Sequence, residues 1–151
     1  MEKKTRVAVL MLSKVFTKEH RNAGKPTYFL EKMQAGTKLH TIRLNYDLWK
    51  HKADQINAGD MVLSVRQWEA QPYKSQQVEV ARLTQLHVQR FEAVYGATDT
   101  IPRVWVDGCE VIDVEQVAKN DGLELGDWVD FFFKRTNHVE GVVLQFTDFM
   151  Y

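Results

Sequence analysis

The sequence predicts an α+β fold of one domain, in which mostly antiparallel strands curl into a barrel and short helices pack over the ends of that barrel. Three observations lead to this prediction. The chain has 151 residues, a length that suits a single domain spanning residues 1–151. Segments with alternating or β-branched apolar residues make up most of the middle of the chain. Most of these segments follow one another through short turns, which favours antiparallel pairing and closure of the sheet.

Strands and helices are expected to alternate in the first part of the chain. Residues 6–13 are rich in Val and Leu and predict a strand, whereas the polar residues 14–25 predict a loop. Residues 26–36 begin with a proline and end with a glycine, as a helix does. Residues 38–44 predict the next strand, and residues 46–60 predict an amphipathic helix.

The middle of the chain reads as successive strands. Residues 61–69 alternate between apolar and polar side chains, and residues 76–94 form a long run of β type. Within residues 104–112, the pair Asp107–Gly108 separates two short apolar runs. An Asp-Gly pair in this position is the strongest short-range signal for a β-hairpin.

Two short helices and a final strand are expected to close the chain. Residues 113–122 begin with a capping aspartate and end with a glycine, which predicts a helix. Residues 124–134 predict a second helix, and residues 138–149 predict the last strand. Three aromatic residues of the second helix have the spacing of one helix face, so we expect them in the core: Trp128, Phe131 and Phe132.

Composition excludes several classes of protein. The hydrophobic fraction of 44% and the charged fraction of 26% are those of an ordinary globular protein. No apolar run is long enough to span a bilayer, so we expect no membrane partner and a cytoplasmic location. Cys109 is the only cysteine, which leaves no internal disulfide. The five histidines lack the spacing of metal ligands, so we expect no metal and no other cofactor. The oligomeric state is not predicted.

Charge is distributed unevenly along the chain. Residues 1–60 carry 12 Lys/Arg and 6 Asp/Glu, whereas residues 61–151 carry 8 and 14. Such asymmetry is typical of a protein with a polyanion-binding face, but the two halves can also interleave in space and cancel. Residues 107–130 contain eight acidic residues and one lysine, so a nucleic acid is expected to lie away from them.

The segment at residues 36–43, Gly-Thr-Lys-Leu-His-Thr-Ile-Arg, gathers three groups suited to chemistry. Thr41 and Arg43 share one face of the predicted strand, and Lys38 stands where the chain enters it. A lysine whose pKa is lowered by burial or by a neighbouring cation can act as a base toward a threonine hydroxyl. The arginine fork suits a phosphate or a base edge. From spacing alone, a strand edge with solvated charges is the favoured explanation of these residues.

A second candidate for ligand contact lies near the predicted turn after residue 69. Arg66 and Trp68 stand at the end of a strand, next to Tyr73 and Lys74. Aromatic and basic side chains in this arrangement stack on the bases of single-stranded nucleic acid. The alternative is that Trp68 covers one end of the barrel.

The motif around Lys38 resembles the signature of the ASCH domain, a family with a PUA-like β-barrel that is proposed to bind RNA. That signature is a glycine, then Lys-x-x-Thr-x-Arg, and later a Gly-Asp pair at the start of a strand. The chain has these residues in order: Gly36, Lys38, Thr41, Arg43, Gly59 and Asp60. The later segment at residues 117–132 is similar to larger members, and the resemblance covers most of residues 7–149. It implies a cleft beside Lys38, Thr41 and Arg43 that binds RNA, a nucleoside or a nucleotide.

One branch of the family resembles bacterial amidohydrolases that remove the acetyl group from N4-acetylcytidine. In that branch a lysine accepts a proton, a threonine is the nucleophile and a glutamate donates a proton. The resemblance assigns the first two roles to Lys38 and Thr41. The position of the glutamate falls at Asn120, which has no acidic proton, and Asp121 beside it is the first substitute. Glu115 and Glu124 are nearby alternatives.

The sequence therefore predicts a binding domain for RNA or a nucleotide, with an amidohydrolase acting on an acylated nucleoside as the alternative. Cleavage of RNA by the lysine and arginine, and a protein-interaction domain without a ligand, are two weaker alternatives. Motifs for nucleoside triphosphates, dinucleotides and serine hydrolases are absent from the sequence.

Overall fold

The computed structural model describes residues 4–151, and the first three residues of the predicted domain lie outside the described residues. Residues 4–151 form eight strands and four helices, which confirms the α+β class. The strands are β1 (Arg6–Met11), β2 (His40–Arg43), β3 (Met61–Trp68), β4 (Gln77–Leu83), β5 (His87–Val94), β6 (Arg103–Val106), β7 (Cys109–Val111) and β8 (His138–Gln145). The helices are α1 (Phe29–Gln34), α2 (Tyr46–Asn57), α3 (Val114–Asn120) and α4 (Leu125–Phe132).

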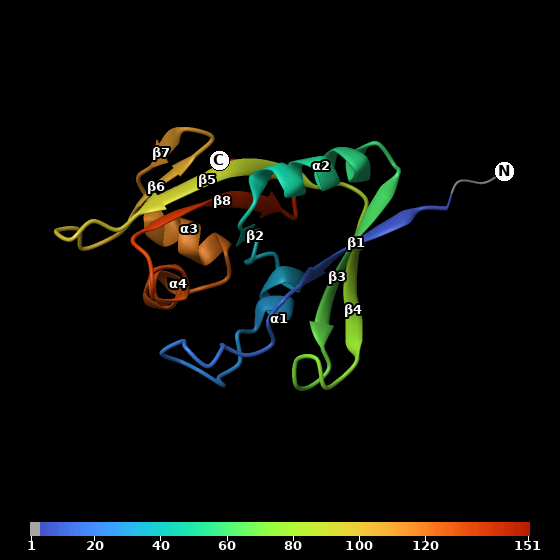
Figure 1. The fold of residues 1–151 in the computed structure, drawn as a ribbon, viewed down its shortest axis with the longest axis horizontal. Coiled ribbons are helices and arrows are strands. Elements are labelled where there is room, and N and C mark those ends of the chain that lie inside the picture. The colour runs from blue at the N-terminus through green and yellow to red at the C-terminus, as the bar shows by residue number, and fades with distance from the viewer. Residues whose placement is uncertain (1–3) are drawn as a thin grey trace.

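The strands form two sheets rather than one (Figure 1). The smaller sheet has the order β1-β3-β4, and the larger has the order β2-β8-β5-β6-β7. All neighbouring strands are antiparallel except β1 and β3, which are parallel. Within residues 4–151 the strand pairing does not close the two sheets into a barrel, so the closed barrel stays a prediction.

The long β-type run predicted at residues 76–94 consists of two strands that lie in different sheets. β4 ends at Leu83 and β5 begins at His87 in the other sheet. Asn57, at the end of α2, holds the bend between them, because its side chain donates to the Leu86 carbonyl at 2.9 Å and accepts from the Leu86 N–H at 2.9 Å. Leu86 is fully buried at this bend, so its side chain packs in the core at the point where the chain passes from the smaller sheet to the larger.

Two of the local signals in the sequence are confirmed. Asp107 and Gly108 both have positive φ, of 51° and 81°, and join β6 to β7 as a two-residue hairpin turn requires. The Asp113 side chain accepts from the Gln116 N–H at 3.1 Å and caps the first turn of α3. The helix predicted at residues 26–36 is shorter, because α1 begins only at Phe29.

One continuous core joins both sheets, α2 and α4. Trp128 of α4 is fully buried and packs edge-on against Phe91 of β5, with ring centroids 6.2 Å apart. Phe131 does not follow it into the core. Its side chain is 39% exposed, so the prediction that the whole aromatic stripe is core was wrong at this position.

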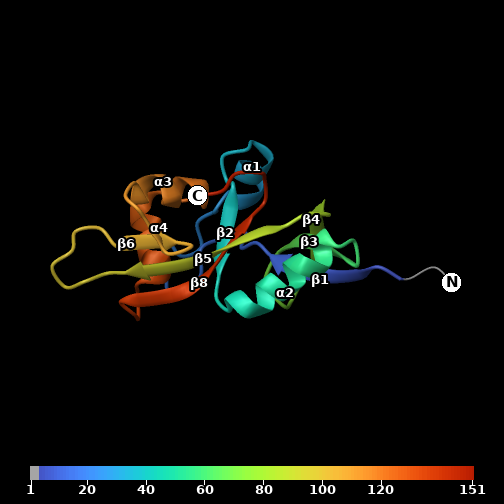
Figure 2. The same cartoon turned by 90° about the horizontal axis from the view of Figure 1, so that it is seen from above.

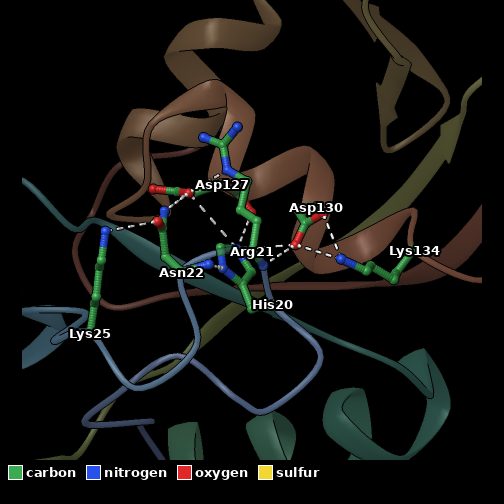
Figure 3. Close-up of polar contacts among 7 residues, drawn as sticks. All are labelled: His20, Arg21, Asn22, Lys25, Asp127, Asp130 and Lys134. Carbon is green, nitrogen blue, oxygen red and sulfur yellow. Dashed lines mark hydrogen bonds and ion pairs between the residues drawn. The ribbon is translucent and has the colours of Figure 1, made fainter.

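The loop between β1 and α1 is fastened to α4, as Figure 3 shows. The Arg21 Nε donates to Asp127 Oδ1 at 2.9 Å, and the Arg21 N–H donates to Asp130 Oδ2 at 2.8 Å. His20 is buried, accepts from the Asn22 N–H at its Nδ1, and therefore donates from Nε2 to the Asp127 carbonyl at 3.0 Å. These contacts fix α4, and with it Phe131, relative to the N-terminal loop.

The smaller sheet lies at one end of the molecule and the pair α3 and α4 at the other (Figure 1). β2 lies between them, with α1 and α2 on opposite sides of it in both views (Figure 2). None of the helices in residues 4–151 has the length and apolar character needed to cross a membrane.

Candidate functional site

A cavity of about 590 Å³ opens beside β2 and gathers the residues of the sequence motif. Lys38, Thr41 and Arg43 all line it, together with Asp121 from the end of α3. The apolar wall comes from six segments of the chain and consists of Met11, Phe29, Ile42, Leu44, Leu123, Phe131, Phe132 and Val139. The more polar members of the lining are Ser13, Thr136, His138 and Glu140. A cavity of this size, with apolar walls and a few convergent polar groups, suits a small organic ligand.

The backbone after α1 delivers Lys38 to this cavity. Gly36 ends the helix with φ of 78°, a conformation that favours glycine. The N–H groups of Thr37 and Lys38 then both donate to the Lys32 carbonyl, at 2.9 and 3.0 Å. The Leu39 N–H donates to the Asn120 carbonyl at 2.7 Å, so the start of β2 is attached to the end of α3. The motif glycine thus turns the chain toward α3.

Lys38 is the most deeply buried charged residue of the cavity, with 2% exposure. Its Nζ donates to the Asp121 carbonyl at 2.6 Å and to Asp121 Oδ1 at 3.2 Å, and lies 4.4 Å from the centre of the Phe29 ring. Gly122 follows Asp121 with φ of 84°, and a Cβ atom there would come within 3.1 Å of Lys38 Cδ. Glycine is therefore favoured at this position for two reasons: it adopts positive φ without strain, and it leaves space for the Lys38 side chain.

The charges of Lys38 and Asp121 depend on each other. Burial lowers the pKa of Lys38, the Asp121 carboxylate opposes that effect, and the Arg43 charge adds to the lowering. Burial would raise the pKa of Asp121, but the Lys38 charge and contacts with His40 outweigh it and hold that pKa below its ordinary value. Asp121 is therefore ionised at neutral pH and accepts hydrogen bonds, so in this state it is not a proton donor.

Arg43 and Thr41 are directly linked, which agrees with their predicted shared face. The Arg43 Nη1 donates to Thr41 Oγ1 at 2.6 Å and to the Ile42 carbonyl at 2.9 Å. The Arg43 Nη2 donates to the Met11 carbonyl at 2.8 Å, which joins the end of β1 to β2. A guanidinium has five N–H donors, so these three bonds leave two for a ligand.

A second, buried network lies behind Asp121 and was not found from the sequence. His40 Nδ1 lies 3.7 Å from Asp121 Oδ1, and His40 Nε2 lies 2.6 Å from the Tyr151 hydroxyl. Asn120 Nδ2 donates to the same hydroxyl at 3.0 Å. The Tyr151 hydroxyl therefore donates its hydrogen bond to His40 Nε2. With Nε2 as an acceptor, the imidazole proton is on Nδ1, on the side of the ring near Asp121. Burial raises the pKa of Tyr151, so the phenol stays protonated.

This network gives Asn120 a structural role, at the position that the sequence resemblance predicts to correspond to a glutamate. Asn120 accepts from Gln116 Nε2 at 2.8 Å and donates to Tyr151, so it connects α3 to the last residue of the chain. The two alternative acids do not reach the cavity. Glu115 is exposed and pairs with Lys119 at 3.5 Å, and Glu124 is an exposed residue before α4.

Arg66 and Trp68 lie on β3 and are not brought to the cavity with the other predicted residues. The Arg66 side chain donates to Ser64 Oγ at 2.9 Å and to Gln77 Oε1 at 3.0 Å. Trp68 packs against Tyr73, whose ring is 89% exposed, with ring centroids 5.1 Å apart. Gly59 and Asp60 form the turn between α2 and β3, and neither lines the cavity.

Three residues of the cavity carry no sequence signal of their own. Phe131 could have been recognised only from its exposure, because its spacing is that of a core residue. Met11, at the end of β1, and Leu123, after the end of α3, line the cavity through the tertiary arrangement, which local sequence patterns do not record. No family model, no curated protein and no solved structure matches the chain.

Proposed function

We propose that the protein binds a nucleotide, or an unpaired base of RNA, in the cavity beside β2, as expected for an ASCH-like domain of the PUA-like barrel class. One observation carries this proposal: a cavity of about 590 Å³ combines a cationic and hydroxyl-bearing floor with an aromatic wall. The floor is made by Lys38, Thr41 and Arg43, and the wall includes Phe131 and Phe132.

Each part of the cavity has a role in this binding. A flat base gains apolar contact with the half-open Phe131 ring, in the way that aromatic side chains bind unstacked bases. The two unused N–H groups of Arg43 donate to a phosphate or to base acceptors, and the fork geometry favours two parallel bonds. Asp121 is ionised and supplies an acceptor for an exocyclic amino group. The cavity thus offers stacking, donors and an acceptor to one base.

Equilibrium binding of a fluorescent single-stranded RNA, measured over a range of salt concentrations, tests the proposal. We expect binding that weakens as salt rises, because phosphate contacts release counterions. Arg43→Ala should weaken binding and lower the salt dependence, whereas Arg82→Ala, an exposed arginine of β4, should leave both unchanged. Equal binding by the wild type and the Arg43 variant would contradict the assigned role.

A second candidate function, hydrolysis of an acylated nucleoside such as N4-acetylcytidine, is favoured by the pairing of Lys38 with Thr41 at one cavity. Burial lowers the Lys38 pKa, and this direction favours the neutral amine that a general base requires. The neutral amine takes the Thr41 hydroxyl proton as the oxygen attacks the acyl carbon, and the protonated amine returns that proton to the departing amino group. Water then releases the acid from Thr41. This use of Lys38 requires no separate acid, which fits the ionised state of Asp121.

Incubation with N4-acetylcytidine, with cytidine followed by chromatography, tests the second candidate. We expect release by the wild type and by Thr136→Ala, which alters another threonine of the cavity lining, and none by Thr41→Ala. Release by the Thr41 variant at the wild-type rate would exclude the acyl-enzyme route. Absence of release from every variant would leave binding as the function of the cavity.

A further inference from the structure

A cluster of three metal-ligating side chains lies on the exposed surface of the larger sheet, at the margin of the cavity. Glu92 comes from β5, and His138 and Glu140 come from β8. Glu92 is directly opposite Glu140 in the antiparallel register, and His138 is two residues from Glu140 on the same strand face. All three side chains are therefore presented by paired strands rather than by loops. We propose that Glu92, His138 and Glu140 bind a divalent transition-metal cation such as Zn²⁺.

The distances between the donor atoms fit one metal ion. The His138 Nε2 lies 3.0 Å from Glu92 Oε2 and 3.6 Å from Glu140 Oε1, and all three donor atoms lie within 4.8 Å of one another. Ligands about 2.0–2.2 Å from a tetrahedral zinc are about 3.3–3.6 Å apart, so the observed separations need only small side-chain rotations. One imidazole and two carboxylates form a donor set of the kind that zinc binds, with a fourth position left for water or a ligand.

The charges at this place also favour a cation. Two carboxylates directly opposite each other on neighbouring strands repel and destabilise the pairing. Within residues 4–151, neither Glu92 nor Glu140 forms an ion pair with a lysine or an arginine, and His138 is the only partner of both. The imidazole supplies at most one positive charge, so the two carboxylates leave the cluster with a net negative charge. A divalent cation cancels the two carboxylate charges and uses the imidazole nitrogen as its third ligand.

The position of the cluster gives a bound cation a way to contact the ligand. His138 and Glu140 line the cavity beside β2, and Glu92 and Glu140 line a neighbouring cavity of about 520 Å³. The cation would therefore sit on the ridge between the two, with its free position open to either. A phosphate or carboxylate of a bound molecule is the group that this position would take. The site itself does not depend on the proposed nucleotide binding, because the metal alone is the probe.

The sequence predicts no metal, because no two histidines have ligand spacing. The three ligands escape that reasoning because 46 positions separate Glu92 from His138 and only the pairing of β5 with β8 brings them together. A single histidine with two glutamates also lacks the cysteine and histidine pattern by which zinc sites are usually recognised.

Titration of the chelator-treated protein with Zn²⁺ by calorimetry tests the proposal. We expect one saturable site in the wild type, with affinity lowered by about tenfold or more in Glu92→Gln and in Glu140→Gln, because each removes one ligand charge. The matched control is Glu115→Gln, which alters an exposed glutamate of α3 and should bind as the wild type does. The altered side chains of the cluster are also surface groups, so thermal unfolding should show each variant folded.

Paramagnetic broadening by Mn²⁺ locates the ion independently. In the wild type the imidazole resonances of His138 should broaden before those of His51, an exposed histidine of α2. Equal affinity for Zn²⁺ in the wild type and both cluster variants would overturn the proposal. So would broadening at His51 and His138 to the same degree, or the lack of any saturable zinc binding, since each means that the ion has no defined site. None of these results would change the outcome of the RNA and nucleoside assays, so failure of the metal site can be distinguished from failure of the proposed function.

Discussion

The pair formed by Lys38 and Asp121 can be tested by removing each charge alone and then both together. Lys38→Met keeps the length and apolar stem of the side chain and removes the ammonium group. Asp121→Asn keeps the shape of the carboxylate and removes its charge. Lys38 is 2% exposed and Asp121 is 4% exposed, so neither charge has water to replace a lost partner. We expect removal of one charge to destabilise the fold more than removal of both charges.

The size of the effect follows from the geometry. Two unit charges 3.2 Å apart attract by about 5 kcal/mol at an effective dielectric constant of about 20. Desolvation of both groups offsets most of this attraction in the intact pair, but it is not recovered when one partner is removed. Lys38→Met should therefore lower the free energy of unfolding by about 3–5 kcal/mol. Asp121→Asn should lower it less, because the Asp121 carbonyl still accepts from Lys38 Nζ at 2.6 Å.

Urea unfolding followed by tryptophan fluorescence measures all four forms of this cycle. The double variant should be more stable than Lys38→Met alone, with a coupling free energy of at least about 1 kcal/mol. Should Lys38→Met fail to fold, recovery of folding in the double variant gives the same answer. Additivity of the two single effects to within about 0.5 kcal/mol would refute the idea that the two charges compensate each other.

Three further predictions concern the support of the site. Gly122→Ala should destabilise by about 1 kcal/mol more than Gly24→Ala, because both have positive φ but only the first brings a Cβ against Lys38; urea unfolding of the two variants decides this. The folded-state pKa of Asp121 lies below its ordinary value of 3.8. The stabilisation that the carboxylate provides is therefore present above pH 3.8 and is lost as the pH falls through the folded-state pKa. The difference in unfolding free energy between the wild type and Asp121→Asn should accordingly shrink on acidification below pH 3.8. Asn57→Ala should cost about 2 kcal/mol or more in thermal unfolding, since it leaves the buried N–H and carbonyl of Leu86 without partners, and a cost below about 0.5 kcal/mol would show that this bend does not need the asparagine.

Features specified by neighbouring residues could be predicted from the sequence. The hairpin at Asp107–Gly108 and the cap at Asp113 need only a turn or a first helical turn, and both are present. The strand periodicity also placed Thr41 and Arg43 on one face, where their side chains now share a hydrogen bond of 2.6 Å. These are local consequences of backbone geometry and of side-chain chemistry.

Features that depend on which segments meet in space could not be predicted. The bend before His87 arises because Asn57, from a helix that is distant in the sequence, binds the Leu86 backbone. Tyr151 reaches His40 across 111 positions of the chain, and no periodicity connects them. Phe131 has the spacing of a core residue but stands where α4 faces the cavity. In each case the tertiary arrangement determines the role of the residue, because the residue type alone is compatible with several roles.

The most direct test of the account is a titration of the ¹⁵N-labelled protein with cytidine 5′-monophosphate, followed by two-dimensional NMR. If the cavity beside β2 is the binding site, amide shifts should concentrate at Thr41, Leu123 and Phe131, and should be strongly reduced in Arg43→Ala. Shifts confined to the turn between β3 and β4, around Tyr73, would place binding on the smaller sheet instead. Either that pattern or the absence of shifts at saturating nucleotide would contradict the assignment of this cavity as a nucleotide site.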